Sequence, residues 1–190
     1  MFWWKPAGKL FSLVTTLSLI ACTHVSLQPK VKLPLLPADS WDSRFQLNQS
    51  IIISGQDSAL LLALVKQGDS LEITILSNLG QRLVQLRHDG DGIQMNKHWP
   101  NITLPAEAII RQLQASLWPI DILNQTYTKE WSITDSLCQR NITYRQELVL
   151  TVNYCAHAEG STSQRLLGAR IDDHRSGFSI NIKTHELAPL

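Results

Sequence analysis

The sequence predicts a mainly β protein of the α+β class, with one domain over residues 41–190. Apolar and polar side chains alternate with a period of two at 71–75 and 84–87, and again at 148–154 and 178–183, which is typical of half-buried strands. Between these two groups of strands the apolar residues change to a helical period. Short turns separate neighbouring strands, so we expect the sheet to be antiparallel.

The composition fits a chain with one apolar core. The 190 residues are 44% apolar and 17% charged, and this length suits one ordinary domain. Leu and β-branched residues recur along the chain, which excludes a disordered protein. The 17 Lys and Arg residues nearly balance the 16 Asp and Glu residues, so no excess of charge indicates a nucleic-acid partner.

The N-terminus predicts a secretory signal peptide over residues 1–21. Lys5 and Lys9 carry its only charges, and an apolar run from Leu10 to Ala21 follows them. This run is shorter than the roughly 20 residues that a membrane-spanning helix needs. It ends in Leu19-Ile20-Ala21-Cys22, which resembles the lipobox of bacterial lipoproteins. An ordinary signal peptide with a chance cysteine is the alternative.

The lipobox resemblance has two implications. The peptide is cut before Cys22, and Cys22 is acylated. Thr23 stands where lipoproteins of the inner membrane carry Asp, so the resemblance implies an outer-membrane lipoprotein that faces the periplasm. Residues 22–40 then form the acylated cysteine and an extended tether, because Pro29, Pro34 and Pro37 favour extended backbone.

Four strands are expected between residues 51 and 87, at 51–53, 59–65, 71–75 and 84–87. The run Ala59–Val65 is continuously apolar, and its length favours a strand buried on both faces, with a helix as the alternative. The last three strands form an antiparallel meander. The turns between and after them contain Gly, often beside Asn or Asp: Gln67-Gly68-Asp69, Asn78-Leu79-Gly80 and Asp89-Gly90-Asp91-Gly92.

An amphipathic helix is expected over residues 104–117. Its apolar face consists of Ile109, Ile110, Leu113 and Leu117. Thr103 can cap this helix, and Pro105 fits its first turn. Pro119 disfavours helical backbone at the residue before it and ends the helix. Ile120–Leu123 can add a short second helix.

Cys138 and Cys155 form an even pair once Cys22 is acylated, and an oxidising periplasm would join them. A turn at Arg140-Asn141 would hold them about 40 Å apart along the sheet, beyond the reach of a disulfide. A turn centred on Gln146 brings positions 138 and 154 opposite each other, and a β-bulge can absorb the remaining residue. We therefore predict the turn at Gln146 and a structural disulfide, with two independent thiols as the alternative.

The turn at Gln146 would gather four apolar side chains on one face: Ile142, Tyr144, Leu148 and Leu150. A last strand is expected over Phe178–Ile182, after a turn at Asp172–Ser176. The small and polar segment Ala156–Ser163 is expected to form a loop.

The stretch Leu60–Leu123 resembles an uncharacterised family of bacterial lipoproteins. Its members are often encoded beside fatty-acid-synthase-like enzymes that make aryl polyene pigments and related lipids. The first part, Ala63–Leu86, also resembles LolB, the outer-membrane lipoprotein receptor, in its order of strands and turns. The motifs that carry the family resemblance are Leu76-Ser77-Asn78-Leu79-Gly80-Gln81-Arg82-Leu83, His88-Asp89-Gly90, Leu104-Pro105, Leu117-Trp118-Pro119 and Gly177-Phe178-Ser179-Ile180-Asn181-Ile182.

The resemblance implies a half-open antiparallel β-barrel of the LolA and LolB type, with a helix lid over an apolar cavity that holds acyl chains. LolB hands lipoproteins to the membrane through an exposed hydrophobic loop residue, whose counterpart the sequence does not place. The alternative is an ordinary filled core, since buried Leu and Ile need no ligand. The candidate cavity residues are Leu71, Ile73, Ile75, Val84, Leu86, Ile109, Leu113, Leu117 and Trp118.

The sequence favours no catalytic or metal site, and no cofactor is expected. It has no nucleophile elbow, P-loop or dinucleotide fingerprint. Asp89-Gly90-Asp91-Gly92 lacks the remaining ligands of a calcium loop, so a plain turn is expected. Asp172-Asp173-His174 could orient a general base, but no Ser or Cys partner is identifiable, and a solvated turn is favoured.

The sequence therefore predicts a non-enzymatic carrier or receptor for a hydrophobic lipid or acyl chain. An aryl polyene-type product or the chains of a lipoprotein would be its cargo, and a periplasmic carrier protein could be its partner. A tethered scaffold with a filled core is the first alternative, and an esterase or thioesterase is the second.

Overall fold

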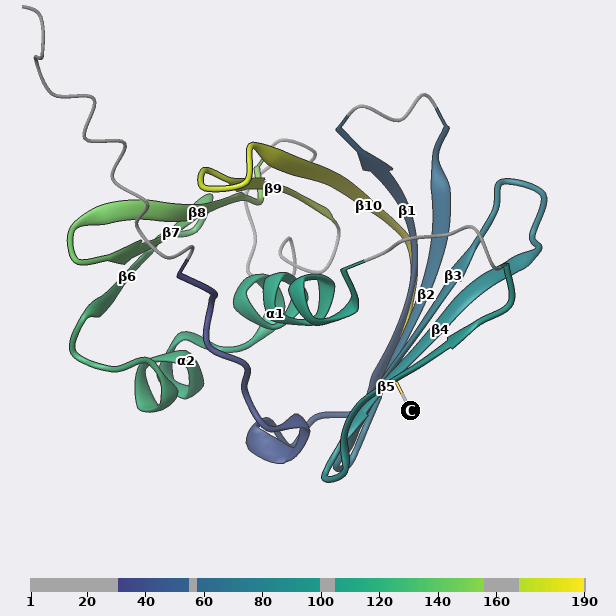
Figure 1. Ribbon diagram of the computed structural model, residues 1–190, viewed down its shortest axis with the longest axis horizontal. Coiled ribbons are helices and arrows are strands. Elements are labelled where there is room, and N and C mark those ends of the chain that lie inside the picture. Colours follow the sequence, from purple (N-terminus) through teal and green to yellow (C-terminus); the bar gives the residue numbers. More distant parts are fainter. Residues whose placement is uncertain (1–30, 55–57, 100–104, 156–167, 190) are drawn as a thin grey trace, which may run out of the picture. The chain divides into compact units, whose positions relative to one another are not determined.

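Ten antiparallel strands form one open sheet in the described part of the chain, in the order β5-β4-β3-β2-β1-β10-β9-β8-β7-β6. The computed structural model describes residues 31–54, 58–99, 105–155 and 168–189, which belong to one unit, Val31–Leu190. The predicted signal peptide, Cys22 and the first part of the tether lie outside the described residues. The helix α1 (Ala106–Leu117) lies on the concave side of the curved sheet (Figure 1). This arrangement confirms the predicted mainly β fold with a covering helix.

The elements follow one another as a first group of strands, two helices and a second group of strands. A short 3-10 helix, η1 (Ala38–Ser40), precedes the sheet. The first group is β1 (Phe45–Ile53), β2 (Leu60–Gln67), β3 (Ser70–Leu76), β4 (Arg82–Asp89) and β5 (Gly92–Lys97). After α1 and α2 (Ile120–Thr126) come β6 (Trp131–Asp135), β7 (Gln139–Tyr144), β8 (Glu147–Asn153), β9 (Gly168–Asp173) and β10 (Phe178–Pro189).

The first and last strands along the chain, β1 and β10, are neighbours in the sheet. β1 pairs with β2 on one side and with β10 on the other, and Ile51 lies opposite Ile182. The edge strands are β5 and β6, so the sheet curves around the helix without closing. The described residues contain no helix that is long and apolar enough to cross a membrane.

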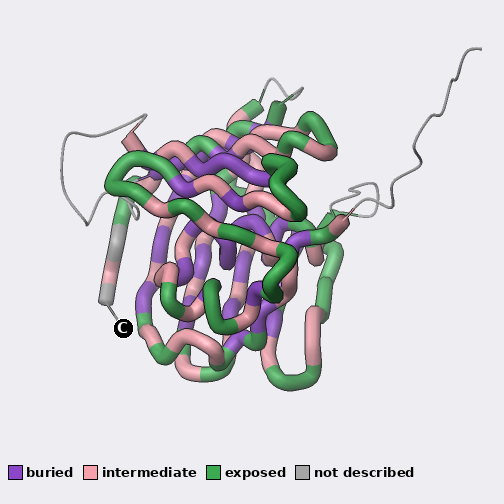
Figure 2. The backbone as a smooth tube through the Cα atoms, turned by 90° about the vertical axis from the view of Figure 1, so that its left-hand side faces the viewer, coloured by how far each residue is buried: buried purple, intermediate pink, exposed green. Residues whose placement is uncertain are grey.

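Burial alternates along most strands, as Figure 2 shows by colour. In β2 the side chains of Leu62, Leu64 and Lys66 are buried, whereas those between them are partly exposed. The prediction that Ala59–Val65 is buried on both faces is therefore wrong. An antiparallel sheet covered by a helix on one side leaves its other side to water, and apolar residues such as Ile52 remain exposed there.

The helical prediction is confirmed, with small changes at the start. α1 begins at Ala106, and Pro105 is its N-cap rather than part of its first turn. Thr103, the expected cap, lies outside the described residues. The helix ends before Trp118, as Pro119 requires, and the short second helix is present as α2.

The β7–β8 hairpin has the predicted turn and disulfide. Arg145 and Gln146 adopt left-handed φ values of 49° and 71°, and the pairing of Gln139 with Asn153 places position 138 opposite 154. Cys138 and Cys155 are joined, with their Cα atoms 4.9 Å apart. The loop expected at Ala156–Ser163 lies outside the described residues.

A β-bulge in this hairpin corrects one expected face. Ile142 pairs with Leu150 and Thr143 pairs with Leu148, so Val149 is the extra residue. The bulge turns Leu148 away from the face of Leu150, and Leu148 is 41% exposed while Val149 is buried. The expectation that Leu148 shares the face of Ile142 is therefore wrong.

Candidate functional site

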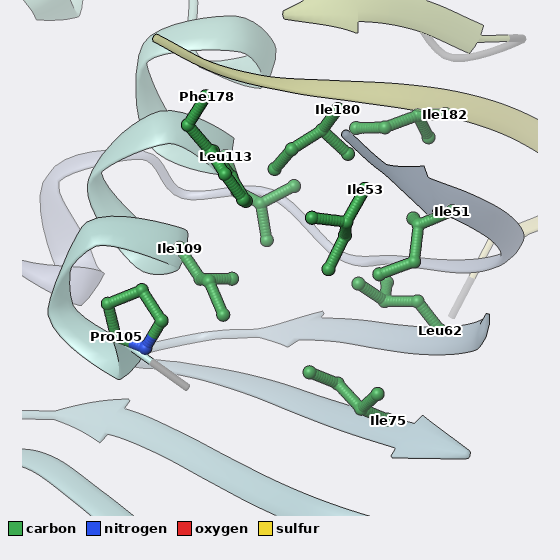
Figure 3. Close-up of a pocket in the computed structure, with 10 residues that line it drawn as sticks. All are labelled: Ile51, Ile53, Leu62, Ile75, Pro105, Ile109, Leu113, Phe178, Ile180 and Ile182. Carbon is green, nitrogen blue, oxygen red and sulfur yellow. The ribbon is translucent and has the colours of Figure 1, made fainter. Parts of the chain in front are cut away.

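An apolar cavity of about 120 Å³ lies between the concave face of the sheet and the first half of α1. Figure 3 shows that the side chains around it come from three strands of the first group, from β10 and from the helix. No polar or charged side chain belongs to its lining, which consists of Ile51, Ile53, Leu62, Ile75, Pro105, Ile109, Leu113, Phe178, Ile180 and Ile182.

The floor of the cavity is built by the pairing of β1 with β10. Ile51 pairs with Ile182, and Ile53 pairs with Ile180, so four branched side chains share one face. Residues two apart on a strand point to the same face, which explains the alternation of Ile with Ser and Asn in β10. Branched side chains are stiff at χ1, and this part of the wall therefore has little freedom to rearrange.

The roof of the cavity is the apolar stripe of α1. Ile109 and Leu113 are one turn apart and face the sheet. Pro105, which precedes the helix, is exposed and marks the side of the cavity nearest to solvent.

Three of the nine candidate cavity residues line this space: Ile75, Ile109 and Leu113. The other six lie elsewhere in the core, where Leu71, Ile73, Val84 and Leu86 are fully buried and Leu117 packs at the edge. Trp118 is also fully buried, and its indole Nε1 donates to Ser40 Oγ at 3.1 Å. The residues from β1 and β10 were missed because nothing in the sequence shows that these distant strands are neighbours.

The last turns of α1 are held by buried hydrogen bonds. Gln114 bonds both the backbone N–H and the carbonyl of Leu36, at 3.0 and 2.9 Å. The Tyr154 hydroxyl donates to the Ser116 carbonyl at 2.8 Å. The Arg140 guanidinium donates to the carbonyls of Ala115 and Trp118 at 2.7 and 2.9 Å.

The first turn of α1 is held differently. Its acidic side chain, Glu107, pairs with exposed Lys32 at 3.6 Å and with Arg111 on the helix itself. Arg111 also donates to the Leu33 carbonyl, so the segment expected to end the tether packs along the helix. Surface ion pairs contribute little, and the first turn otherwise rests on the apolar cavity. The N-terminal end of α1 is therefore the end that can lift at the lowest free-energy cost.

Two exposed apolar side chains lie at the same end of the sheet as the cavity. Leu79, in the turn after β3, is 81% exposed, and Trp99, after β5, is 48% exposed. The backbone N–H of His98 donates to the Leu83 carbonyl at 2.9 Å, which places the end of β5 beside the start of β4. Exposed Arg82 follows Leu79 by three residues, and exposed Lys97 precedes Trp99 by two residues. The sequence contained Leu79 within a motif, but its exposure depends on the three-dimensional turn.

Residues 44–186 match the family described as "Protein of unknown function (DUF3261)". The chain belongs to this family. No curated protein is similar enough in sequence to count as a relative of this family member.

Two solved structures are similar to the family member in three dimensions. A LolA superfamily protein from Nitrosomonas europaea is 11% identical, with a TM-score of 0.46, and the match covers 84% of this chain and 94% of the other. A domain assigned to an outer membrane lipoprotein-sorting protein from Vibrio parahaemolyticus is 10% identical, with a TM-score of 0.39 and coverage of 80% and 87%. Neither similarity is close enough to assign a ligand or a partner, so any function must rest on the geometry of the site.

In the two acidic motifs, Asp89 and Asp173 end the strands β4 and β9 and stabilise the turns that follow. Asp89 accepts a hydrogen bond from the backbone of Asp91 at 3.0 Å and pairs with Arg87, and the hydrogen bond from Arg87 lowers the pKa of Asp89. Asp173 accepts from the backbone N–H of Arg175 at 3.0 Å. His174 is exposed, with its ring 2.9 Å from the Thr151 hydroxyl. Among the described residues no group of His, Cys, Asp or Glu is arranged to hold a metal ion.

Proposed function

We propose that this protein is a non-enzymatic carrier or receptor that shields an acyl chain in the periplasm. The observation that carries the proposal is a cavity lined only by apolar side chains, between a stiff sheet and a helix that is firmly held at its C-terminal end. Each methylene group buried there contributes about 0.8 kcal/mol to the free energy of binding. Several such groups are enough to bind an acyl chain through apolar contacts alone.

The present volume admits only a few carbon atoms. Ligand pockets usually measure about 300–1,000 Å³, and a cavity of about 150 Å³ holds benzene. A longer chain therefore requires the first turn of α1 to lift, which would widen the cavity towards Pro105. Leu113 and Ile109 would then contact the acyl chain, whereas in the present structure they face the side chains of the sheet.

Membrane contact at the cavity end of the sheet would release the chain. Leu79 and Trp99 can enter the interfacial region of a bilayer, where Trp is favoured, while Arg82 and Lys97 face anionic head groups. Acylation of Cys22 would keep the protein within reach of the outer membrane. An aryl polyene-type chain and the chains of a lipoprotein are both cargo that this mechanism accommodates.

Lipid that remains bound after purification tests the proposal. We expect native mass spectrometry of the chain from Cys22 onward, with Cys22→Ser and purified without detergent from its own cells, to show an acyl lipid. Ile53→Trp should remove that lipid by filling the cavity. Ile52→Trp is the matched control, because Ile52 is the next residue of β1 and is 48% exposed on the other face.

The carrier function would be contradicted if the folded protein contained no lipid in any preparation and did not bind added fatty acyl chains. This result would favour the scaffold alternative, in which the same residues are simply core.

A further inference from the structure

Two buried glutamines on the concave side of the sheet carry oxygen atoms without a hydrogen-bond donor. They are Gln49 in β1 and Gln112 in α1, each 4% exposed. In the described residues the Oε1 atom of each is buried and has no partner. A buried acceptor that lacks a donor costs about 1–3 kcal/mol, and native proteins retain few of them.

Gln112 is not part of the cavity lining, but its neighbours on the helix are. It precedes Leu113 and lies one turn after Ile109, both of which line the cavity. Its Nε2 donates to Asp173 Oδ2 at 3.3 Å, and Asp173 pairs with Phe178, another lining residue. A carboxylate only accepts hydrogen bonds, so the orientation of this amide is settled and its oxygen is the unpartnered atom.

Gln49 is not part of the lining either, but its neighbours on the floor are. Residues two apart on a strand share a face, so Gln49 points to the same side as Ile51. It also pairs directly with Leu62 in β2, and both of these neighbours line the cavity. Its Nε2 donates to Thr184 Oγ1 at 2.9 Å, which leaves its oxygen without a donor.

We infer that Gln49 and Gln112 determine specificity for an acyl chain that carries an N–H or O–H donor. This inference rests on the proposed carrier function and names its ligand class. Each glutamine donates one amide hydrogen within the protein and leaves its buried oxygen as an acceptor without a donor. A chain that ends in an ester or a carboxylate offers no donor to them, whereas an amide-linked or hydroxylated chain does. Lifting of the first turn of α1 gives the ligand access to both oxygen atoms.

The test compares ligands of equal chain length. Decanamide, 1-decanol and methyl decanoate would compete with the hydrocarbon probe diphenylhexatriene for the Cys22→Ser chain. We expect at least one of the two donor-bearing ligands to bind about tenfold more tightly than methyl decanoate, the gain of about one satisfied hydrogen bond. The amide and alcohol arms distinguish an N–H donor from an O–H donor.

The double variant Gln49→Met/Gln112→Met should lose this preference and bind methyl decanoate at least as well as the unaltered protein. Gln46→Met is the control, since Gln46 lies on the opposite face of β1 and should keep the preference. Equal binding of all three ligands by the unaltered protein would overturn the inference while the carrier function stands. Preference retained in the double variant would also overturn it. Failure of the protein to bind the probe or any ligand would overturn both.

Discussion

Arg140 is expected to be the most sensitive single charge in the fold. Its side chain is 1% exposed and pairs with Asp135, with Nε to Oδ1 and Nη2 to Oδ2 both at 3.1 Å. Its remaining Nη1 donates to two carbonyls at the C-terminal end of α1, those of Ala115 and Trp118. One guanidinium therefore joins β7 to the end of the lid helix.

Replacement of Arg140 by Met should lower the free energy of unfolding by about 3–5 kcal/mol, the range for breaking one partner out of a buried ion pair. Met fills much of the volume, so the loss comes from the hydrogen bonds that Arg140 no longer gives to Asp135 and to the two carbonyls. Urea unfolding followed by far-UV circular dichroism measures it.

Arg145→Met is the matched control. Arg145 lies at the end of the same hairpin and pairs with Glu130, but the two side chains are 68% and 47% exposed. Exposed pairs contribute about 1 kcal/mol or less. The reasoning is refuted if Arg140→Met costs no more than Arg145→Met, because burial would then have no bearing on the interaction.

Three further outcomes are expected from the same unfolding assay. Reduction of the disulfide, or Cys138→Ser/Cys155→Ser, should cost about 3 kcal/mol, since the bond closes a loop with a sequence separation of 17; a loss under 1 kcal/mol would contradict this. Tyr127→Phe should leave stability unchanged or raise it by about 1 kcal/mol, because the buried hydroxyl has no partner in the described residues. Lys66 is fully buried, and burial lowers its pKa despite the nearby Asp42, Asp69 and Asp39. The pKa of Lys66 is therefore lower in the folded protein than in the unfolded chain. Between these two pKa values the unfolding free energy of the unaltered protein should rise with pH relative to that of Lys66→Met. A difference between the two proteins that does not change with pH would contradict this.

Local features of the sequence were sufficient for most elements. The turn at Gln146 and the Cys138–Cys155 pair follow from spacing along one hairpin, where the partners are close in the chain. The position of the bulge does not follow in the same way. Placing the extra residue at Val149 rather than elsewhere decides that Leu148 faces solvent, and the apolar pattern of β8 is compatible with either choice.

The cavity was only partly predictable, for a physical reason. Ile75, Ile109 and Leu113 could be chosen because strand and helix periods show which residues share a face. The other half of the floor depends on the pairing of Ile51 with Ile182 and Ile53 with Ile180. These contacts join strands from the two ends of the domain. The alternation of apolar and polar residues in a strand does not indicate which other strand pairs with it. The same strand period predicts Leu71 as a cavity residue, but Leu71 is fully buried in the core and does not line the cavity.

The division of the cavity wall between sheet and helix determines how it can open. Each of β1 and β10 is hydrogen-bonded on both sides, and widening the floor would break ladder bonds whose groups could not be satisfied elsewhere. The first turn of α1 has no such constraint, because the backbone hydrogen-bond ladder of an α-helix runs along the helix and not to a neighbouring element. Lifting the first turn of α1 exposes apolar surface and breaks the surface ion pair of Glu107 with Lys32. An acyl chain that enters covers that surface again, so ligand binding itself offsets most of the cost of opening.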